Sequence, residues 1–142
     1  MDNTSKLYAP RYWPTWLGIV LLWCLTRLPF GMQVWMGRGL GRLLMRVAPK
    51  RRHIVRVNLE LCFPELDSSA TEKLVVYNFE SMGIAIFEMG MSWWSSNRRL
   101  EKLFTVEGME NLEQALAGGR GAILLSAHFT TMEIGGRMLA MR

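Results

Sequence analysis

The first long hydrophobic run of the chain extends over residues 12–37 and contains one charged residue, Arg27. A helix that crosses a bilayer needs about 20 mostly apolar residues, and this run reaches that length only by including Arg27 and Pro29. An arginine near a helix end can extend its charge to the headgroups, and Trp13 and Trp16 suit an interfacial aromatic belt. We therefore predict a membrane anchor helix at 12–37, with an in-plane or re-entrant segment as the alternative.

Residues 1–11 precede this run as a short polar segment, and residues 38–100 follow it as a basic and amphipathic helical region. Apolar residues recur at helical spacing from Met32 to Val47, from Pro49 to Leu61, and from a capping-box start at Ser69 to Trp93. Pro64 ends the second of these stretches, because a proline disfavours helix at the residue before it. The pattern therefore predicts three helices in this region.

Residues 101–142 change to a strand–helix–strand pattern. Leu103–Val106 is a short apolar run, Met109–Ala117 has helical spacing before two glycines, and Ala122–Ser126 is apolar up to its last residue. Such alternation is typical of a parallel sheet covered by helices. We predict an α/β fold: an N-terminal membrane helix, then helices, then the first part of a catalytic α/β domain at 101–142.

Charge divides the chain into a basic front and a mildly acidic rear. Ten of the 17 lysine and arginine residues precede Glu60, against one acidic residue, Asp2. Most of these basic residues follow the hydrophobic run, and the positive-inside rule then predicts an inner-membrane protein, single-pass or monotopic, with its C-terminal bulk in the cytoplasm. Anionic lipid fits the front better than nucleic acid, because no base-reading motif accompanies the charges.

Three arginines of the basic front recur every four residues: Arg38, Arg42 and Arg46. They share one face of a helix whose leucines lie on another face, so we predict that they bind anionic lipid or substrate. The alternative is an ordinary solvated face. The two cysteines, Cys24 and Cys62, form no CxxC pair and imply neither a disulfide framework nor a zinc site.

His128 and Glu133 are the candidate catalytic pair. His128 follows the apolar run at 122–126, and Glu133 stands five residues later near the start of a helix. Imidazole can accept a hydroxyl proton near neutral pH, and a carboxylate on its other nitrogen fixes the tautomer. The alternative is a chance pairing of a strand-end histidine with a glutamate that suits a helix dipole. Two ligands are too few for a metal site, and Ser126 lacks the G-x-S-x-G elbow of a nucleophile.

Several blocks of the chain resemble a known family. They are Pro10-Arg11-Tyr12-Trp13, Asn58-Leu59-Glu60-Leu61-Cys62-Phe63-Pro64-Glu65, Asn78-Phe79-Glu80-Ser81-Met82-Gly83, Val106-Glu107-Gly108, Arg120-Gly121-Ala122-Ile123-Leu124-Leu125, and His128 with Glu133. Together they are similar to the lipid A biosynthesis lauroyl/palmitoleoyl acyltransferases of Gram-negative bacteria, and they cover nearly all of the chain.

This resemblance implies an acyltransferase that moves a fatty acyl group, laurate or similar, from acyl carrier protein to a hydroxyacyl chain of the Kdo-bearing lipid A precursor. His128 would be the general base and Glu133 its partner, and no cofactor is implied. Members of that family are considerably longer, so we expect this chain to be an N-terminal portion, inactive by itself. The alternatives are a non-catalytic remnant that binds anionic lipid and an acyltransferase of a phospholipid pathway.

Overall fold

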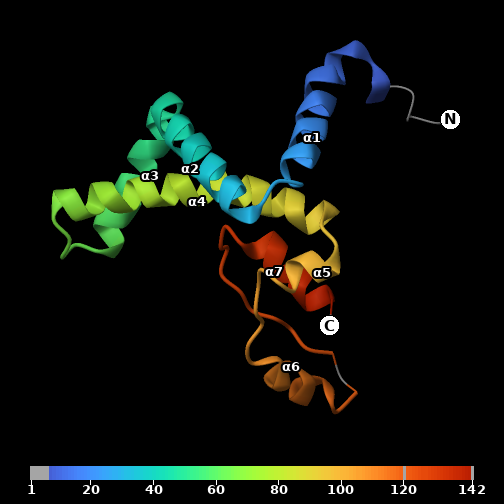
Figure 1. The fold of residues 1–142 in the computed structure, drawn as a ribbon. Helices are drawn as coiled ribbons and strands as arrows, with labels where there is room; N and C mark the ends of the chain where they lie inside the picture. Colours follow the sequence, from blue (N-terminus) through green and yellow to red (C-terminus); the bar gives the residue numbers. More distant parts are fainter. Residues whose placement is uncertain (1–6, 120, 142) are drawn as a thin grey trace.

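The computed structural model describes residues 7–119 and 121–141, and within these residues the chain is helical (Figure 1). Residues 1–6 of the predicted N-terminal segment, and Arg120 of the quoted motif, lie outside the described residues. The elements in chain order are η2 (Pro10–Tyr12), α1 (Trp13–Leu25), α2 (Phe30–Val47), α3 (Pro49–Cys62), α4 (Ser68–Trp94), α5 (Asn97–Leu100), α6 (Met109–Leu116) and α7 (Met132–Ala140).

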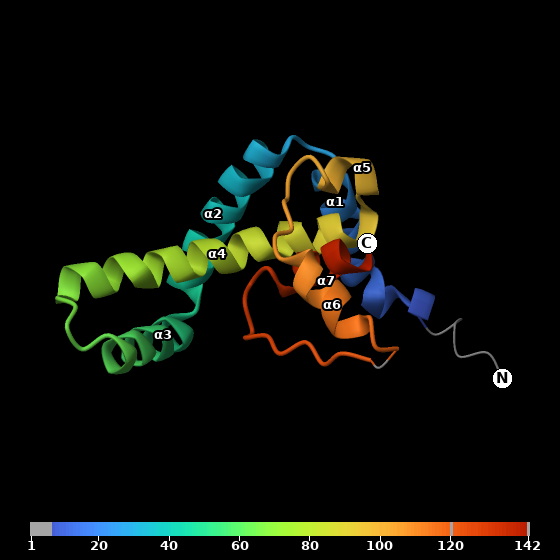
Figure 2. The ribbon, with the colours of Figure 1, turned by 90° about the horizontal axis from the view of Figure 1, so that it is seen from below.

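The long helix α4 is the axis against which α1, α2, α3 and α7 pack (Figure 2). Its N-cap is Asp67, whose carboxylate accepts a hydrogen bond from the backbone N–H of Ala70 at 2.7 Å. The sequence pattern placed this start two residues later, at Ser69. Asp67 satisfies an N–H group that would otherwise have no partner at the helix end, which is the physical role of an N-cap.

Glycines bring α2 and α4 into backbone contact where they cross. A Cβ atom added to Gly37 would lie 2.7 Å from the Cα of Ile84, and one added to Gly41 would lie 2.7 Å from the Cα of Glu80. From the opposite side, a Cβ on Gly83 would lie 2.6 Å from the backbone nitrogen of Gly41. Real Cβ atoms do not approach backbone this closely, so the crossing depends on these three glycines.

Ion pairs fasten the basic helices α2 and α3 to α4. Glu80, with 9% of its side chain exposed, accepts a hydrogen bond from Nε of Arg42 at 2.6 Å, and Nε of Arg38 lies 3.8 Å from its other oxygen. On α3, Arg52 and Arg56 both bind Glu72, the latter at 2.6 Å. Part of the excess positive charge before Glu60 is therefore neutralised by ion pairs within the fold.

The paired arginines give Glu72 a pH-dependent role in stability. Hydrogen bonds from Arg52 and then Arg56 hold the pKa of Glu72 below its ordinary value of 4.5. A carboxyl whose pKa is lowered by folding stabilises the protein above pH 4.5 and loses that contribution as the pH falls through its folded-state pKa. We expect Glu72→Gln to lower the free energy of unfolding at neutral pH by about 0.5–1 kcal/mol, because the pair is about one-third exposed.

Urea unfolding measured at several pH values tests this expectation. The deficit of Glu72→Gln should shrink as the pH is lowered below 4.5. The matched control is Glu60→Gln on α3, because Glu60 is exposed and forms no ion pair with any described residue. A Glu72→Gln deficit that stays constant down to the acid limit would contradict the assigned role of the ion pairs.

The predicted anchor helix at 12–37 is wrong. The run is split into α1 and α2 by a turn at 26–29, and no helix among the described residues is long and apolar enough to cross a membrane. Pro29 causes the break, since it is the N-cap of α2 with a non-helical ψ of 144° and it disfavours helix at Leu28. The predicted inner-membrane location, as a single-pass protein, rested on this helix and is contradicted by the same finding.

The predicted α/β fold is also wrong, since no β-strand occurs in residues 7–119 or 121–141. Residues 103–106 and 122–126 have strand-like composition, but neither segment pairs with the other or with any other described segment. A strand requires a neighbour to accept and donate its ladder hydrogen bonds. Ile123 and Leu125 consequently remain 98% and 99% exposed.

Candidate active site

The segment that carries His128 leads from residue 121 to the N-terminus of α7. The backbone N–H of Phe129 donates to the carbonyl of Ala127 at 3.0 Å, so the chain makes a γ-turn with His128 at its centre. Met132 N–H then binds the carbonyl of Phe129 at 3.2 Å and begins the helix. His128 is exposed on this corner, where its imidazole is open to a substrate.

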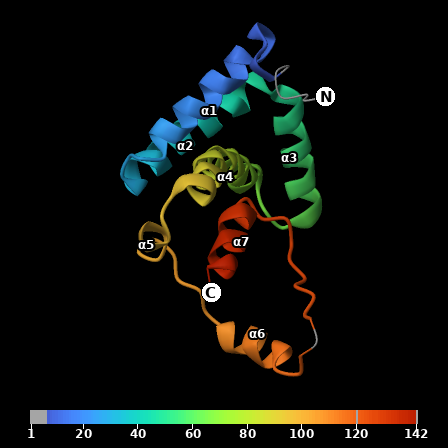
Figure 3. The ribbon, with the colours of Figure 1, turned by 90° about the vertical axis from the view of Figure 1, so that its right-hand side faces the viewer.

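Glu133 lies in the first turn of α7, as predicted, and its side chain is exposed. A carboxylate at this position interacts favourably with the positive end of the helix dipole. Helix α7 is held on α4 by its buried residues Ile134 and Met138, which pack in one cluster with Met91 and Leu100 (Figure 3). The fold therefore fixes the position of Glu133 more firmly than that of His128.

The structure brings His128 and Glu133 onto one short stretch of chain but does not join them. In the part of the chain that the structure describes, no hydrogen bond or ion pair links the two side chains. They are separated by the turn at 129–131. Their catalytic pairing therefore stays a prediction.

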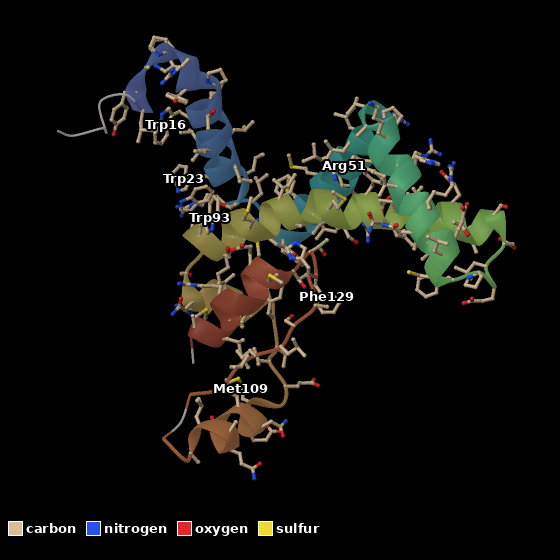
Figure 4. All side chains as sticks on the ribbon, turned by 180° about the vertical axis from the view of Figure 1, so that it is seen from behind. Trp16, Trp23, Arg51, Trp93, Met109 and Phe129 are labelled. Carbon is tan, nitrogen blue, oxygen red and sulfur yellow. The ribbon has the colours of Figure 1, made fainter. Side chains whose placement is uncertain are left out.

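A groove lies between α7 and the unpaired segments 104–107 and 124–129. It encloses about 850 Å³, and most of its lining is apolar, including Phe104, Val106, Leu124, Phe129, Met132 and Leu139. Phe129 lies on the segment that enters α7, near the N-terminal end of that helix (Figure 4). Ser126 and Thr131, which flank His128 in sequence, also line the groove. The candidate base thus stands beside an apolar groove of ligand size.

The predicted arginine face lies away from this groove. Arg42 binds Glu80, whereas α7 packs against Met91, eleven residues or about 16 Å further along α4. Arg38 and Arg42 have their side chains 58% and 60% exposed despite contact with Glu80. Arg46 is exposed and forms no ion pair with any described residue.

Sequence reasoning missed three charged residues that the fold uses. Arg99 donates to the backbone carbonyls of Thr26 and Leu28, both at 2.5 Å, and so connects the α1–α2 turn to α5. Glu80 receives the α2 arginines, and burial raises the pKa of Glu88 above its ordinary value of 4.5. A signal for the two glutamates existed, because they are the only charged residues between Lys73 and Arg98.

Metal-binding residue types do not gather anywhere in the described ranges, 7–119 and 121–141: no group of three or more histidine, cysteine, aspartate and glutamate side chains is close enough to hold an ion. His128 and Glu133 belong to no such group. The chemistry that the site can support with its own residues is acid–base chemistry by an exposed imidazole next to an apolar groove.

The candidate site thus consists of an exposed histidine close in sequence to residues that line an apolar groove, on a helical scaffold. The family described as bacterial lipid A biosynthesis acyltransferase matches residues 1–142, and the chain belongs to this family. The resemblance predicted from the sequence blocks is confirmed by this match. No solved structure matches the chain significantly.

Several individual proteins similar to this chain are named as lipid A acyltransferases. The chain is 43% identical over 139 residues to the lipid A biosynthesis lauroyltransferase of Escherichia coli K12, and the match covers 98% of this chain and 45% of that protein. It is 39% identical over 138 residues to the palmitoleoyltransferase of the same organism, with 97% and 45% covered. The corresponding myristoyltransferase is 25% identical over 131 residues, with 92% and 41% covered. The chain thus spans less than half the length of these relatives.

Proposed function

We propose that the complete protein transfers a fatty acyl group to a hydroxyl of a lipid A precursor during lipopolysaccharide biosynthesis. The observation that carries this proposal is the family match over the whole chain, together with relatives named lauroyl- and palmitoleoyltransferases. The finer assignment is an acyl carrier protein thioester as donor and a hydroxyacyl chain of the Kdo-bearing precursor as acceptor. The groove beside His128 supports an aliphatic substrate.

His128 acts in this proposal as the general base. Its imidazole takes the proton of the acceptor hydroxyl as the oxygen attacks the thioester carbonyl, and the thiol leaves with a proton returned from the imidazolium. Glu133 holds the imidazole in the required tautomer and stabilises its charged form. Since the thioester is already reactive, the transfer is direct and needs no acyl-enzyme. The exposed position of both side chains supports their access to substrate.

Arg38, Arg42 and Arg46 are assigned to the anionic groups of the acceptor or of surrounding lipid, and the acidic carrier protein is a further partner that suits a basic surface. Arg46 is the best candidate, because it is exposed and outside the ion pairs with Glu80. Arg38 and Arg42 already share a carboxylate, so a ligand would have to compete with Glu80 for them.

Product analysis tests the proposed reaction. The complete protein is supplied with lauroyl-acyl carrier protein and, in parallel, with a Kdo-bearing lipid A precursor or a lysophospholipid, and the products are weighed by mass spectrometry. We expect laurate on the lipid A precursor alone, with the acceptor KM raised severalfold by Arg46→Glu. Acylation of the lysophospholipid alone would replace the proposal with a phospholipid-pathway enzyme, and no acylated product would refute both.

A further inference from the structure

Helix α7 has two apolar faces, of which only one is used by the fold. Ile134 and Met138, one turn apart, are buried against α4. Ile134 and Met138 also border the groove, but Met132, Gly135, Gly136 and Leu139 line it from the opposite face of the helix, and Met132 and Leu139 remain 42% and 37% exposed. An amphipathic helix needs one apolar face for its core, so the second face is available to a ligand.

The lining of this groove indicates which chemistry it accepts. Of the described residues that line it, Glu107 alone is charged. A negative charge disfavours the phosphates or carboxylates of an acceptor, whereas an aliphatic chain can cover the exposed side chains without a charge of its own. The volume of about 850 Å³ is within the range of small-molecule sites.

The groove also has a direction. Of the described hydroxyl-bearing residues that line it, Ser126 and Thr131 lie within three residues of His128 in sequence, Thr105 lies on the opposite segment, and the lining along α7 extends to Leu139. From Met132 to Leu139 the helix rises by about 10 Å. A carbonyl placed near the hydroxyls would therefore send its hydrocarbon tail along α7, past the two glycines.

Gly135 and Gly136 keep the middle of the groove open. No atom lies within 4 Å of a Cβ built on either residue, so a side chain there would project into empty space. Glycine inside a helix costs about 0.5–1 kcal/mol relative to alanine, and the fold shows no close packing at these positions that would require it. This contrasts with Gly37, Gly41 and Gly83, whose missing side chains admit another helix.

We propose that this groove holds the hydrocarbon tail of the transferred acyl group, and that Gly135 and Gly136 determine how long a tail it accepts. The assignment rests on the proposed acyl transfer and adds to it the site of the tail and the residues that set chain length. A side chain at position 136 would stand between the hydroxyl-bearing end and Leu139, and would shorten the usable groove.

The test compares Gly136→Leu and Gly136→Ala with the unaltered complete protein. Rates are measured with octanoyl-, decanoyl-, lauroyl-, myristoyl- and palmitoyl-acyl carrier protein, and binding of sodium laurate and sodium octanoate is measured by calorimetry below their micelle concentrations. We expect Gly136→Leu to shift the preferred donor to shorter chains and to weaken laurate binding about tenfold or more, since each excluded methylene costs about fourfold. Octanoate binding should change less than laurate binding. The effects of Gly136→Ala should be intermediate between the unaltered protein and Gly136→Leu.

The matched control is Gly39→Leu on α2, because Gly39 is also an exposed helix glycine with open space around it and lies outside the groove. It should leave both measurements unchanged. The experiment distinguishes failure of the proposed function from failure of the groove assignment. If no acyl transfer occurs but Gly136→Leu still blocks laurate binding, the proposed function is refuted and the groove remains the binding site of the tail. Laurate binding and donor preference that are unaffected by Gly136→Leu overturn the groove assignment, whatever the activity.

Discussion

Replacement of His128 with alanine is expected to lower kcat of the complete protein by about 10²–10⁴-fold, the usual contribution of a positioned general base. The loss should occur without unfolding, because His128 is exposed on a γ-turn and makes no contact in the core. Steady-state rates with a lauroyl donor and a lipid A precursor measure the effect. The residual rate of the variant should rise with pH, because hydroxide then replaces the missing imidazole as the base.

The chain provides its own control for this experiment in His53, the second of its two histidines. His53 is exposed on α3, among arginines and away from the groove, so His53→Ala should retain full activity. Glu133→Gln should give a smaller loss than His128→Ala, since Glu133 acts through the imidazole. Wild-type rates in His128→Ala, with an unchanged circular dichroism spectrum, would remove the assignment of the base.

The helices of the middle region were predictable from the sequence because their signals are local. Pro49, the capping box at Ser69 and the apolar spacing act within one or two helical turns, and α2, α3 and α4 begin and end within two residues of the predicted positions. The same holds for α6 and for the start of α7 next to Glu133.

The errors arose where a segment depends on something beyond its own sequence. The run at 12–37 is apolar enough for one long helix, but Pro29 ends it, and Arg99, over 70 residues away, binds the carbonyls that the break exposes. Residues 122–126 have the composition of a buried strand and find no partner among the described residues. Composition measures the preference of a segment for burial, whereas pairing and burial depend on its neighbours.

In the candidate site, too, local features were predictable and features that depend on distant segments were not. His128 and Glu133 were proposed from their types and spacing. The structure places His128 in a γ-turn rather than at the end of a strand and Glu133 in a first helical turn, and their catalytic pairing stays a prediction. The groove beside them was not predicted, because its walls come from residues 104–107, 124–129 and α7. The arginine face was predicted to bind anionic lipid or substrate, which stays a prediction; the ion pairs of Arg38 and Arg42 with Glu80, about 40 residues distant, were not foreseen.

Substitution of Gly41 by alanine is expected to be strongly destabilising, with a loss of about 3 kcal/mol or more in the free energy of unfolding. The added Cβ would lie 2.6 Å from the carbonyl carbon of Phe79 and 2.7 Å from the Cα of Glu80. Those atoms are backbone of α4 and cannot rotate away, so the two helices must separate, which exceeds the usual 1–3 kcal/mol cost of overpacking. Urea unfolding followed by circular dichroism measures the loss.

Gly39→Ala on the same helix separates this packing effect from helix propensity. Nothing lies within 4 Å of a Cβ at Gly39, so alanine there should stabilise the protein by about 0.5–1 kcal/mol. Opposite signs for two glycines two residues apart can come only from the α2–α4 contact, since their intrinsic preferences are the same. Separation of the helices would also strain the Arg42–Glu80 pair, so Glu80→Gln should cost less in Gly41→Ala than in the unaltered chain. If Gly41→Ala stabilised the protein, α2 would not cross α4 at this point. The attachment of the arginine face on α2 to α4, the helix against which α7 packs, would then also be refuted.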